Sequence, residues 1–231
     1  MTRTEAKKTP ALIAYQQKHN ADRRAARAAA KFAKLSTPRE GAREELVHRL
    51  VDSISSINAE EIKRIFVGNK DAKITIIAFE SLTCSHCANF HEDVYPQLKK
   101  EYLDTGLAKI EFRHFPLDIV ALNASKVSQC KNDGDSSMLN SLFANQQKWV
   151  KGSSVEEANE NLQKFLESEG FNVDFKKCIE NKEIEDFILN DRIDGVKKYK
   201  VNATPTIIIN DKKFEKSLNY KNLKKALEKL I

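Results

Sequence analysis

The segment Phe79-Glu-Ser-Leu-Thr-Cys-Ser-His-Cys87 is the most informative part of the sequence, because a predicted buried strand over 73–80 meets a predicted helix over about 84–102 within it. Cys84 therefore falls at a helix N-terminus, where unpaired N–H groups and the helix dipole favour an anion and lower the pKa of a thiol. Cys87 follows one turn later, close enough to attack a mixed disulfide on Cys84. The stretch predicts a redox-active cysteine pair.

His86 and the spacing of the cysteines give this pair its predicted chemistry. A protonated His86 adds a positive charge beside the thiolate, and a stabilised thiolate makes the disulfide a stronger oxidant. Half of a zinc site is the alternative for a Cys-x-x-Cys pair, but the chain has no second pair of this kind. A soft metal such as Cu(I), held by Cys84, His86 and Cys87, is a further interpretation.

A second strand and a long helical stretch are predicted after the cysteine helix. Residues 107–112 form the strand, and two strands joined by a helix predict a parallel pair with a right-handed crossover. The pattern over about 118–198 is helical, interrupted by turn-forming residues. Two short strands and an amphipathic helix then complete the pattern, at 206–210, 213–216 and 218–230. This order predicts an α/β fold: β-α-β, then helices, then β-β-α.

A proline precedes the first strand of this hairpin. In Thr204-Pro205-Thr206 the proline has no N–H to donate to a sheet, and it marks a strand entry. Alone, the tripeptide is a common turn signal. Combined with the cysteine pair after an early strand, it predicts a cis Thr204–Pro205 bond facing Cys84 and Cys87.

Composition separates the first 50 residues from the rest. The chain has 231 residues, of which 41% are hydrophobic, and a net charge of +6. Residues 1–50 hold 12 Lys and Arg against 5 Asp and Glu, whereas residues 51–231 hold 27 against 28. We expect residues 1–55 to be a basic, Ala- and Arg-rich helical extension, partly disordered, and residues 56–231 to be the globular domain. Seven glycines and five prolines exclude a collagen-like class, and no apolar run is long enough for a membrane helix.

The extension permits several roles. A basic arm can bind nucleic acid or anionic membranes, but aromatic residues are sparse in it and no nucleic-acid motif is present, so no nucleic-acid partner is expected. Apolar residues recur at helical spacing within a predicted helix over 40–66: Val47, Leu50, Ile54 and Ile57. We expect this stripe to pack on its own domain, with oligomerisation through the N-terminal helix as the alternative. No secretory hydrophobic segment follows the basic start.

Residues from about Phe66 to the C-terminus also resemble a known family. The resemblance rests on motifs in the family's order and spacing: Phe79-Glu-Ser-Leu-Thr-Cys-Ser-His-Cys-Ala88, Phe90-His91, Phe112-Arg-His-Phe-Pro-Leu-Asp118, Gln129-Cys130, Val201-Asn-Ala-Thr-Pro-Thr206 and Ile209-Asn-Asp-Lys212. The chain is similar to the DsbA family of thioredoxin-fold disulfide oxidoreductases of the bacterial periplasm. The resemblance implies a thioredoxin fold with a helical insertion at about 118–198, and it covers none of residues 1–50.

The resemblance implies a thiol-disulfide oxidoreductase that introduces disulfide bonds into exported proteins. Cys84, Cys87 and His86 are the implied catalytic residues, and Thr204 and Pro205 the implied substrate-binding residues. No metal is implied, and no cofactor beyond the redox-active disulfide. The implied partners are reduced or unfolded exported proteins and a membrane-bound thiol oxidase for reoxidation, in the periplasm. Two alternatives stay open, a disulfide isomerase or reductase, which Thr204 favours, and a copper-handling module.

Two positions depart from the family's pattern. Many members carry proline after the first cysteine, where this chain has Ser85. Many also carry a buried acid six residues before that cysteine, where this chain has Ala78. Glu80 lies on the same face of the predicted strand and either substitutes for that acid or is a surface residue at the strand end. We favour the surface position for Glu80 and a surface or core-edge position for His91.

The other two cysteines lie within the helical stretch. Four cysteines allow three pairings, and a Cys84–Cys87 bond leaves Cys130 with Cys178. Members of the resembled family carry a cysteine pair at these places, so the resemblance implies a structural disulfide. Such a bond fits an oxidising compartment, whereas two buried free thiols are the alternative.

Overall fold

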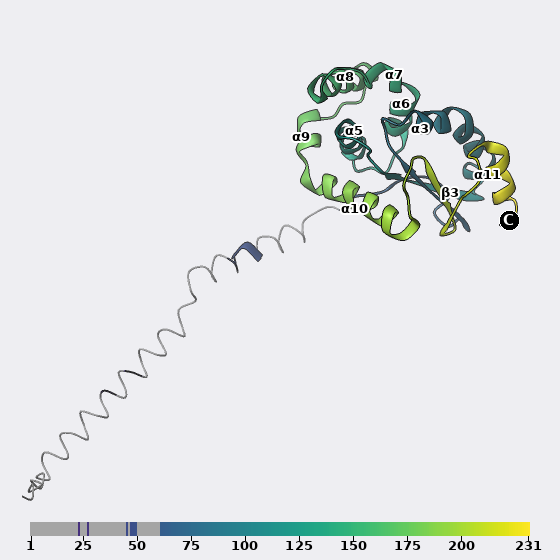
Figure 1. Cartoon of the computed structure of the whole chain (residues 1–231), viewed down its shortest axis with the longest axis horizontal. Coiled ribbons are helices and arrows are strands. Elements are labelled where there is room, and N and C mark those ends of the chain that lie inside the picture. The colour runs from purple at the N-terminus through teal and green to yellow at the C-terminus, as the bar shows by residue number, and fades with distance from the viewer. Residues whose placement is uncertain (1–22, 24–26, 28–44, 46, 50–60) are drawn as a thin grey trace, which may run out of the picture. The chain divides into compact units, whose positions relative to one another are not determined.

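The computed structural model describes residues 61–231 and, before them, residues 23, 27, 45 and 47–49 (Figure 1). The chain divides into two compact units, Met1–Glu60 and Glu61–Ile231. The described residues of the first unit are helical and exposed. Val47, the first residue of the predicted apolar stripe, is 55% exposed. The other stripe residues, Leu50, Ile54 and Ile57, and the predicted role of the extension in oligomerisation lie outside the described residues. Among the described helices, none is both long enough and apolar enough to cross a membrane.

A five-stranded mixed sheet forms the centre of the second unit. The strands lie side by side in the order β1-β3-β2-β4-β5. β2 and β3 are parallel, and every other neighbouring pair is antiparallel. This arrangement confirms the predicted β-α-β unit and the later hairpin. The strand bounds are β1 Ile65–Gly68, β2 Ile74–Glu80, β3 Ala108–His114, β4 Thr206–Ile209 and β5 Lys212–Lys213.

Strand β1 shows that the predicted helix over 40–66 was wrong at its C-terminal end. Ile65 lies opposite Phe112 on the edge of β3 and is 2% exposed. A short apolar segment that lies along an open sheet edge can form backbone hydrogen bonds with the neighbouring strand. This tertiary contact outweighs the weak helical preference that the spacing of its apolar residues suggests. Gly68 has a φ of +107°, and a Cβ there would lie 2.5 Å from the carbonyl oxygen of Ala108. Glycine is therefore required where β1 ends against β3.

The helix predicted over about 84–102 is confirmed, as four consecutive segments. Two of them, η1 and η2, are π-helical turns, which are wider than the α-helix. Pro96 lies between these turns and has no N–H to bond to the preceding turn, a usual cause of helix distortion. The segments are α3 Ser85–Asn89, η1 Phe90–Val94, α4 Tyr95–Leu98 and η2 Lys99–Leu103.

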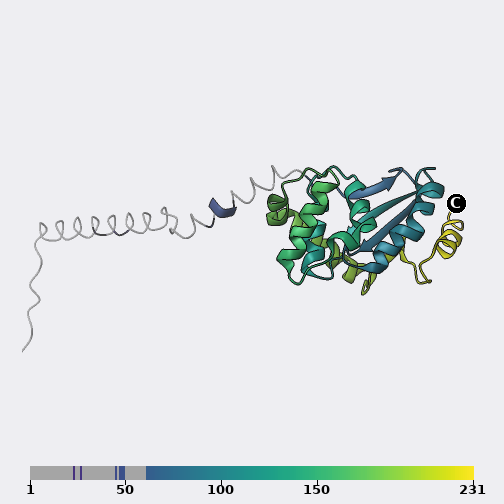
Figure 2. The ribbon, with the colours of Figure 1, turned by 90° about the horizontal axis from the view of Figure 1, so that it is seen from above.

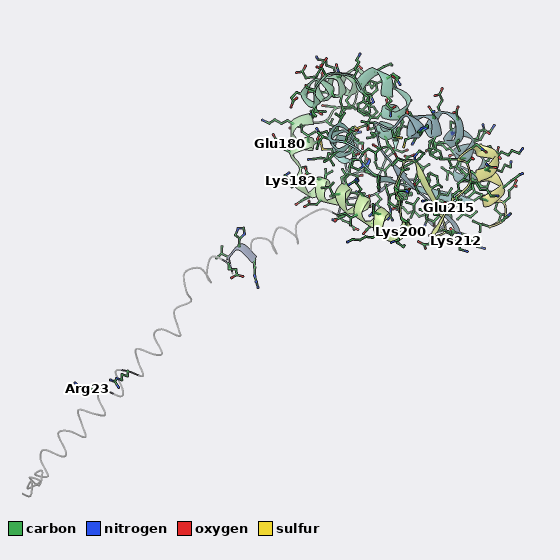
Figure 3. All side chains as sticks on the ribbon, in the orientation of Figure 1. Arg23, Glu180, Lys182, Lys200, Lys212 and Glu215 are labelled. Carbon is green, nitrogen blue, oxygen red and sulfur yellow. A yellow bond between two sulfur atoms is a disulfide. The ribbon has the colours of Figure 1, made fainter. Side chains whose placement is uncertain are left out.

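The helical insertion occupies the chain between β3 and β4. Helices α5 to α9 gather at one end of the sheet, and α11 (Tyr220–Leu227) lies at the other (Figure 1 and Figure 2). Lys182 and Lys200 mark the two ends of the long helix α10 in Figure 3. The insertion helices are α5 Ile119–Gln129, α6 Ser137–Ala144, α7 Gln146–Trp149, α8 Val155–Ser168, α9 Phe175–Glu180 and α10 Lys182–Tyr199.

Helix α10 approaches the central strand β2 closely through a glycine. A Cβ on Gly195 would lie 2.8 Å from the ring of Phe79, so only glycine permits this approach. The Phe79 ring is fully buried and packs against the rings of Phe115 and Tyr199, with centroids 6.4 and 5.9 Å away. The end of β2 is thereby fixed, and the loop that carries the cysteines starts from a rigid support.

Candidate active site

The turn after β2 places Cys84 at the start of helix α3. Its backbone is extended, and its carbonyl oxygen accepts hydrogen bonds from the N–H groups of Cys87 and Ala88 at 3.1 and 3.2 Å. The side chain of Cys84 is partly exposed, whereas Cys87 is 0% exposed. An incoming thiol can therefore reach Cys84 but not Cys87.

The loop before β4 lies against the first cysteine. The Thr204–Pro205 bond is cis, which confirms the prediction. The thiol of Cys84 donates a hydrogen bond to the carbonyl oxygen of Thr204 at 3.4 Å. The antiparallel pairing of β2 with β4, with Phe79 opposite Thr206, brings the two loops together. Segments about 120 positions apart in the chain therefore meet at one sulfur atom.

The surroundings of the two cysteines make them chemically unequal. Hydrogen bonding from the Cys87 thiol contributes most to lowering the pKa of Cys84 to about 5, with further contributions from Thr204 and from the backbone N–H groups of Cys87 and His86. Burial opposes this shift but does not outweigh it. Burial, the neighbouring Cys84 and the charge of Glu80 raise the pKa of Cys87. At neutral pH the reduced site is a Cys84 thiolate beside a Cys87 thiol.

We expect the Cys84 thiol to titrate far below the pKa of about 8.5 of a free cysteine. In the reduced protein, thiolate absorbance near 240 nm should rise with a midpoint near pH 5. A Cys87→Ser variant keeps a hydroxyl donor beside Cys84 and should titrate in the same acidic range. A midpoint at or above pH 8 in the reduced parent would contradict this assignment.

The same shift predicts how the stability of the reduced protein depends on pH. The pKa of Cys84 is lower in the folded protein than in the unfolded chain, so ionisation favours folding. This contribution is complete above the pKa of the unfolded chain and disappears as the pH falls to about 5. Urea unfolding of the reduced and oxidised forms at pH 9, 7 and 5 should therefore show a difference in unfolding free energy that shrinks toward acid pH.

A cavity of about 470 Å³ opens at the cis-proline loop. The predicted site residues His86, Thr204 and Pro205 all line it. Asn89, Phe90, Asp93, Val94, Leu218, Asn219 and Tyr220 complete its walls. The structure thus brings the predicted substrate-binding residues and His86 to one hollow, and one of its lining residues, Thr204, accepts the hydrogen bond of the Cys84 thiol.

Glu80 and His91 form a buried pair, whereas the sequence favoured a surface position for Glu80 and a surface or core-edge position for His91. His91 Nε2 and Glu80 Oε2 are 3.0 Å apart, and the two residues are 8% and 3% exposed. The π-helical turn η1 carries His91 over the end of β2, where the ring stacks on Phe143 with centroids 4.1 Å apart. The sequence pattern could not show this cover, because Phe143 comes from the distant helix α6.

Two residues of the insertion hold the cysteine loop, and neither contact was predicted from the sequence. Asp118 accepts a hydrogen bond from the Thr83 hydroxyl at 2.7 Å and also caps helix α5. The side-chain amide of Gln146 donates to the carbonyl oxygens of Leu82 and Cys84 at 2.8 and 3.1 Å. A glutamine within a long helical stretch carries no sequence signal of such a contact.

Cys130 and Cys178 are joined by a disulfide across 48 positions of the chain. The bond links the C-terminal end of α5 to helix α9. Cys178 is 1% exposed, whereas Cys130 is partly exposed. The two remaining cysteines, Cys84 and Cys87, are free thiols in this structure.

We expect the Cys130–Cys178 bond to survive a mild reductant that opens a Cys84–Cys87 disulfide. Cys178 is buried, and the loop that the Cys130–Cys178 bond closes adds about 4 kcal/mol of stability in the chain-entropy model. Differential alkylation followed by mass mapping measures this. Labelling of both Cys130 and Cys178 in protein isolated without reductant would show that they are free thiols.

The copper-handling alternative needs several ligands around Cys84. His86 is exposed and Cys87 is buried. In the part of the chain that the structure describes, no group of three or more His, Cys, Asp or Glu side chains is placed to hold a metal ion.

A Cys-x-x-Cys pair at the start of a helix, opposite a cis-proline loop at the edge of a mixed sheet, defines the thioredoxin-fold thiol-disulfide oxidoreductases as a class. The thioredoxin family model matches residues 60–229. The chain belongs to the DsbA family within this class. The predicted thioredoxin fold with a helical insertion is therefore confirmed.

Individual relatives agree with this assignment. The crystal structure of Wolbachia pipientis alpha-DsbA1 is 29% identical, with a TM-score of 0.65, over 76% of this chain and 94% of that one. Disulfide bond formation protein D of Bacillus subtilis is 28% identical over 71% of this chain and 75% of its own length. A Rickettsia bellii relative named as a protein-disulfide oxidoreductase is 30% identical over 71% of this chain. The chain spans 52% to 63% of the length of three such Rickettsia relatives.

Proposed function

We propose that this protein is a thiol-disulfide oxidoreductase that acts as a dithiol oxidase on exported proteins through Cys84 and Cys87. One observation carries the proposal: an accessible Cys84 with a strongly lowered pKa lies against the cis Thr204–Pro205 loop, while Cys87 is buried behind it. This is the arrangement that favours attack by a substrate thiolate on one defined sulfur.

The reaction proceeds by two thiol-disulfide exchanges. A substrate thiolate attacks the Cys84 sulfur of the Cys84–Cys87 disulfide, the S–S bond breaks, and the Cys87 sulfur leaves with the electron pair and takes up a proton. The second substrate thiol loses its proton and attacks the substrate sulfur of the mixed disulfide, and Cys84 leaves as a thiolate. The substrate dithiol is thereby oxidised to a disulfide, and the enzyme is reduced by two electrons.

The stabilised Cys84 thiolate supports the oxidising direction. Cys84 is the leaving group in the second step, and a thiol with a pKa of about 5 leaves readily. The reduced enzyme must then be reoxidised, and we assign that step to a membrane-bound thiol oxidase. The Cys130–Cys178 disulfide supports a periplasmic location, because such bonds persist in oxidising compartments.

The loop and the cavity beside Cys84 support binding of an extended substrate segment. In this proposal Thr204 and Pro205 position the substrate main chain, and the cavity lined by His86 and Phe90 takes the side chain next to the reacting cysteine. Strand-like pairing beside a cis-proline loop leaves the substrate sulfur close to Cys84.

Oxidation of a reduced dithiol peptide by the oxidised full-length chain tests the proposal. We expect one equivalent of peptide disulfide per equivalent of enzyme, with Cys84 and Cys87 appearing as thiols. Refolding of a protein with scrambled disulfides, assayed alongside, measures isomerase activity. An enzyme that rearranges scrambled disulfides but leaves the dithiol peptide reduced is an isomerase, and the oxidase proposal then fails.

A further inference from the structure

Gln146 is buried and makes two hydrogen bonds to the backbone of the cysteine loop. The residue is 6% exposed. Its Nε2 atom lies 2.8 Å from the carbonyl oxygen of Leu82 and 3.1 Å from that of Cys84. A single side-chain amide, 62 positions downstream of Cys84, therefore bridges the turn between β2 and α3.

The carbonyl oxygen of Cys84 is a structurally important acceptor. It already accepts the N–H groups of Cys87 and Ala88, which close the first turn of α3. Gln146 supplies a third donor from outside the helix. The backbone N–H groups of Cys87 and His86 contribute to lowering the pKa of Cys84, so the orientation of this turn affects how well they stabilise a thiolate.

The insertion holds Gln146 in place from its own side. Gln146 opens helix α7, and its carbonyl oxygen accepts the N–H of Val150 at 2.9 Å. Trp149, three residues later, is 0% exposed and donates its indole N–H to the carbonyl oxygen of Leu142 at 2.9 Å. Helix α7 is thus locked to α6, and Gln146 projects from a rigid support.

We propose that Gln146 is a positioning residue for Cys84, whose amide fixes the first turn of α3 so that its N–H groups point at the Cys84 sulfur. The proposal rests on the function assigned above, and it makes the redox balance of the cysteine pair depend on the insertion. Without this amide the buried Leu82 oxygen loses a donor, which is costly, and the turn relaxes to recover one. The thiolate then loses part of its stabilisation, and the disulfide becomes a weaker oxidant.

Two substitutions at Gln146 test the proposal. Gln146→Met fills the same space without a donor, and Gln146→Leu also lacks a donor in a shorter apolar side chain. For both we expect the Cys84 titration midpoint to rise and the equilibrium constant for oxidation of reduced glutathione to fall about tenfold, or about 30 mV. Gln163→Met is the matched control, because Gln163 is exposed and pairs only with Glu167 on α8. The Gln163→Met variant should leave the Cys84 titration midpoint and the equilibrium constant with glutathione unchanged.

The unchanged protein offers a second measurement that does not depend on how the variants fold. In the reduced parent, the side-chain amide resonances of Gln146 should shift with the same midpoint as the Cys84 thiolate. The proposal is overturned if the folded variants keep the parent's Cys84 titration midpoint and its equilibrium constant with glutathione. It is also overturned if the Gln146 amide resonances of the parent do not shift as Cys84 titrates. If the parent fails to oxidise the dithiol peptide but Gln146 tracks the titration, the oxidase function fails and the positioning role stands.

Discussion

Replacing Cys84 by serine is expected to abolish oxidation of a dithiol peptide, leaving only the uncatalysed rate. Cys84 is the one accessible sulfur of the pair, and Cys87 is 0% exposed, so no other atom of the pair can receive the substrate thiolate. The measurement is peptide disulfide formation over time. Rapid alkylation at pH 6 should label the reduced parent and miss Cys84→Ser, because Cys87 stays protonated and covered at that pH.

Cys87→Ser is the informative companion to that variant. It cannot form the internal disulfide, but its accessible thiolate should still react with an activated substrate disulfide and form a stable covalent adduct. A Cys84→Ser protein that oxidises the peptide, or a Cys87→Ser protein that forms no adduct, would show that the roles of the two sulfur atoms are assigned wrongly.

His91→Leu is expected to destabilise the protein by about 3–5 kcal/mol, because it leaves Glu80 buried without its partner. The side chains of His91 and Glu80 are only 5% and 4% exposed, so water cannot replace the lost contact. Leucine keeps an apolar side chain against Phe143, which limits the packing loss. Urea unfolding of the oxidised full-length chain gives the free energy.

Two further variants show whether the loss comes from the buried charge. Glu80→Leu combined with His91→Leu removes both partners and should recover part of the stability. Glu160→Ala breaks an exposed pair with Lys164 and should change the free energy by no more than about 0.5 kcal/mol. If His91→Leu costs no more than Glu160→Ala, the buried pair contributes nothing to stability.

Local patterns in the sequence predicted the centre of the site well. The cysteine spacing, the buried strand before it and the Thr204-Pro205 step are each encoded within a few residues, and the structure confirms the cis bond and the β-α-β unit. The predicted roles of Cys84, Cys87 and His86 in catalysis stay predictions. So do the roles of Thr204 and Pro205 in substrate binding.

The features that the sequence analysis missed depend on contacts between distant segments. Strand β1 forms because it pairs with the open edge of β3. The spacing of apolar residues around Ile65 cannot reveal that such an edge is available. Glu80 is buried because η1 and α6 cover it, and Gln146 contacts the cysteine loop from 62 positions away. The spacing of apolar residues in a segment predicts which face of that helix or strand is buried. It cannot predict which side chain from a distant segment packs against that face.

The fastening of the cysteine loop by two insertion helices has an evolutionary consequence. Asp118 and Gln146 lie 35 and 62 positions beyond the residues they hold, and neither belongs to the Cys-x-x-Cys motif. Under the proposed positioning role, mutations in the insertion change the reduction potential of the Cys84–Cys87 pair while the Cys-x-x-Cys motif itself stays the same. Two homologues with the same Ser-His dipeptide between their cysteines need not share the same preference for donating or rearranging disulfides. In this proposal the sequence of the insertion tunes the reduction potential of the cysteine pair independently of the motif. Selection on the insertion can thereby adapt one thioredoxin core to different substrate proteins.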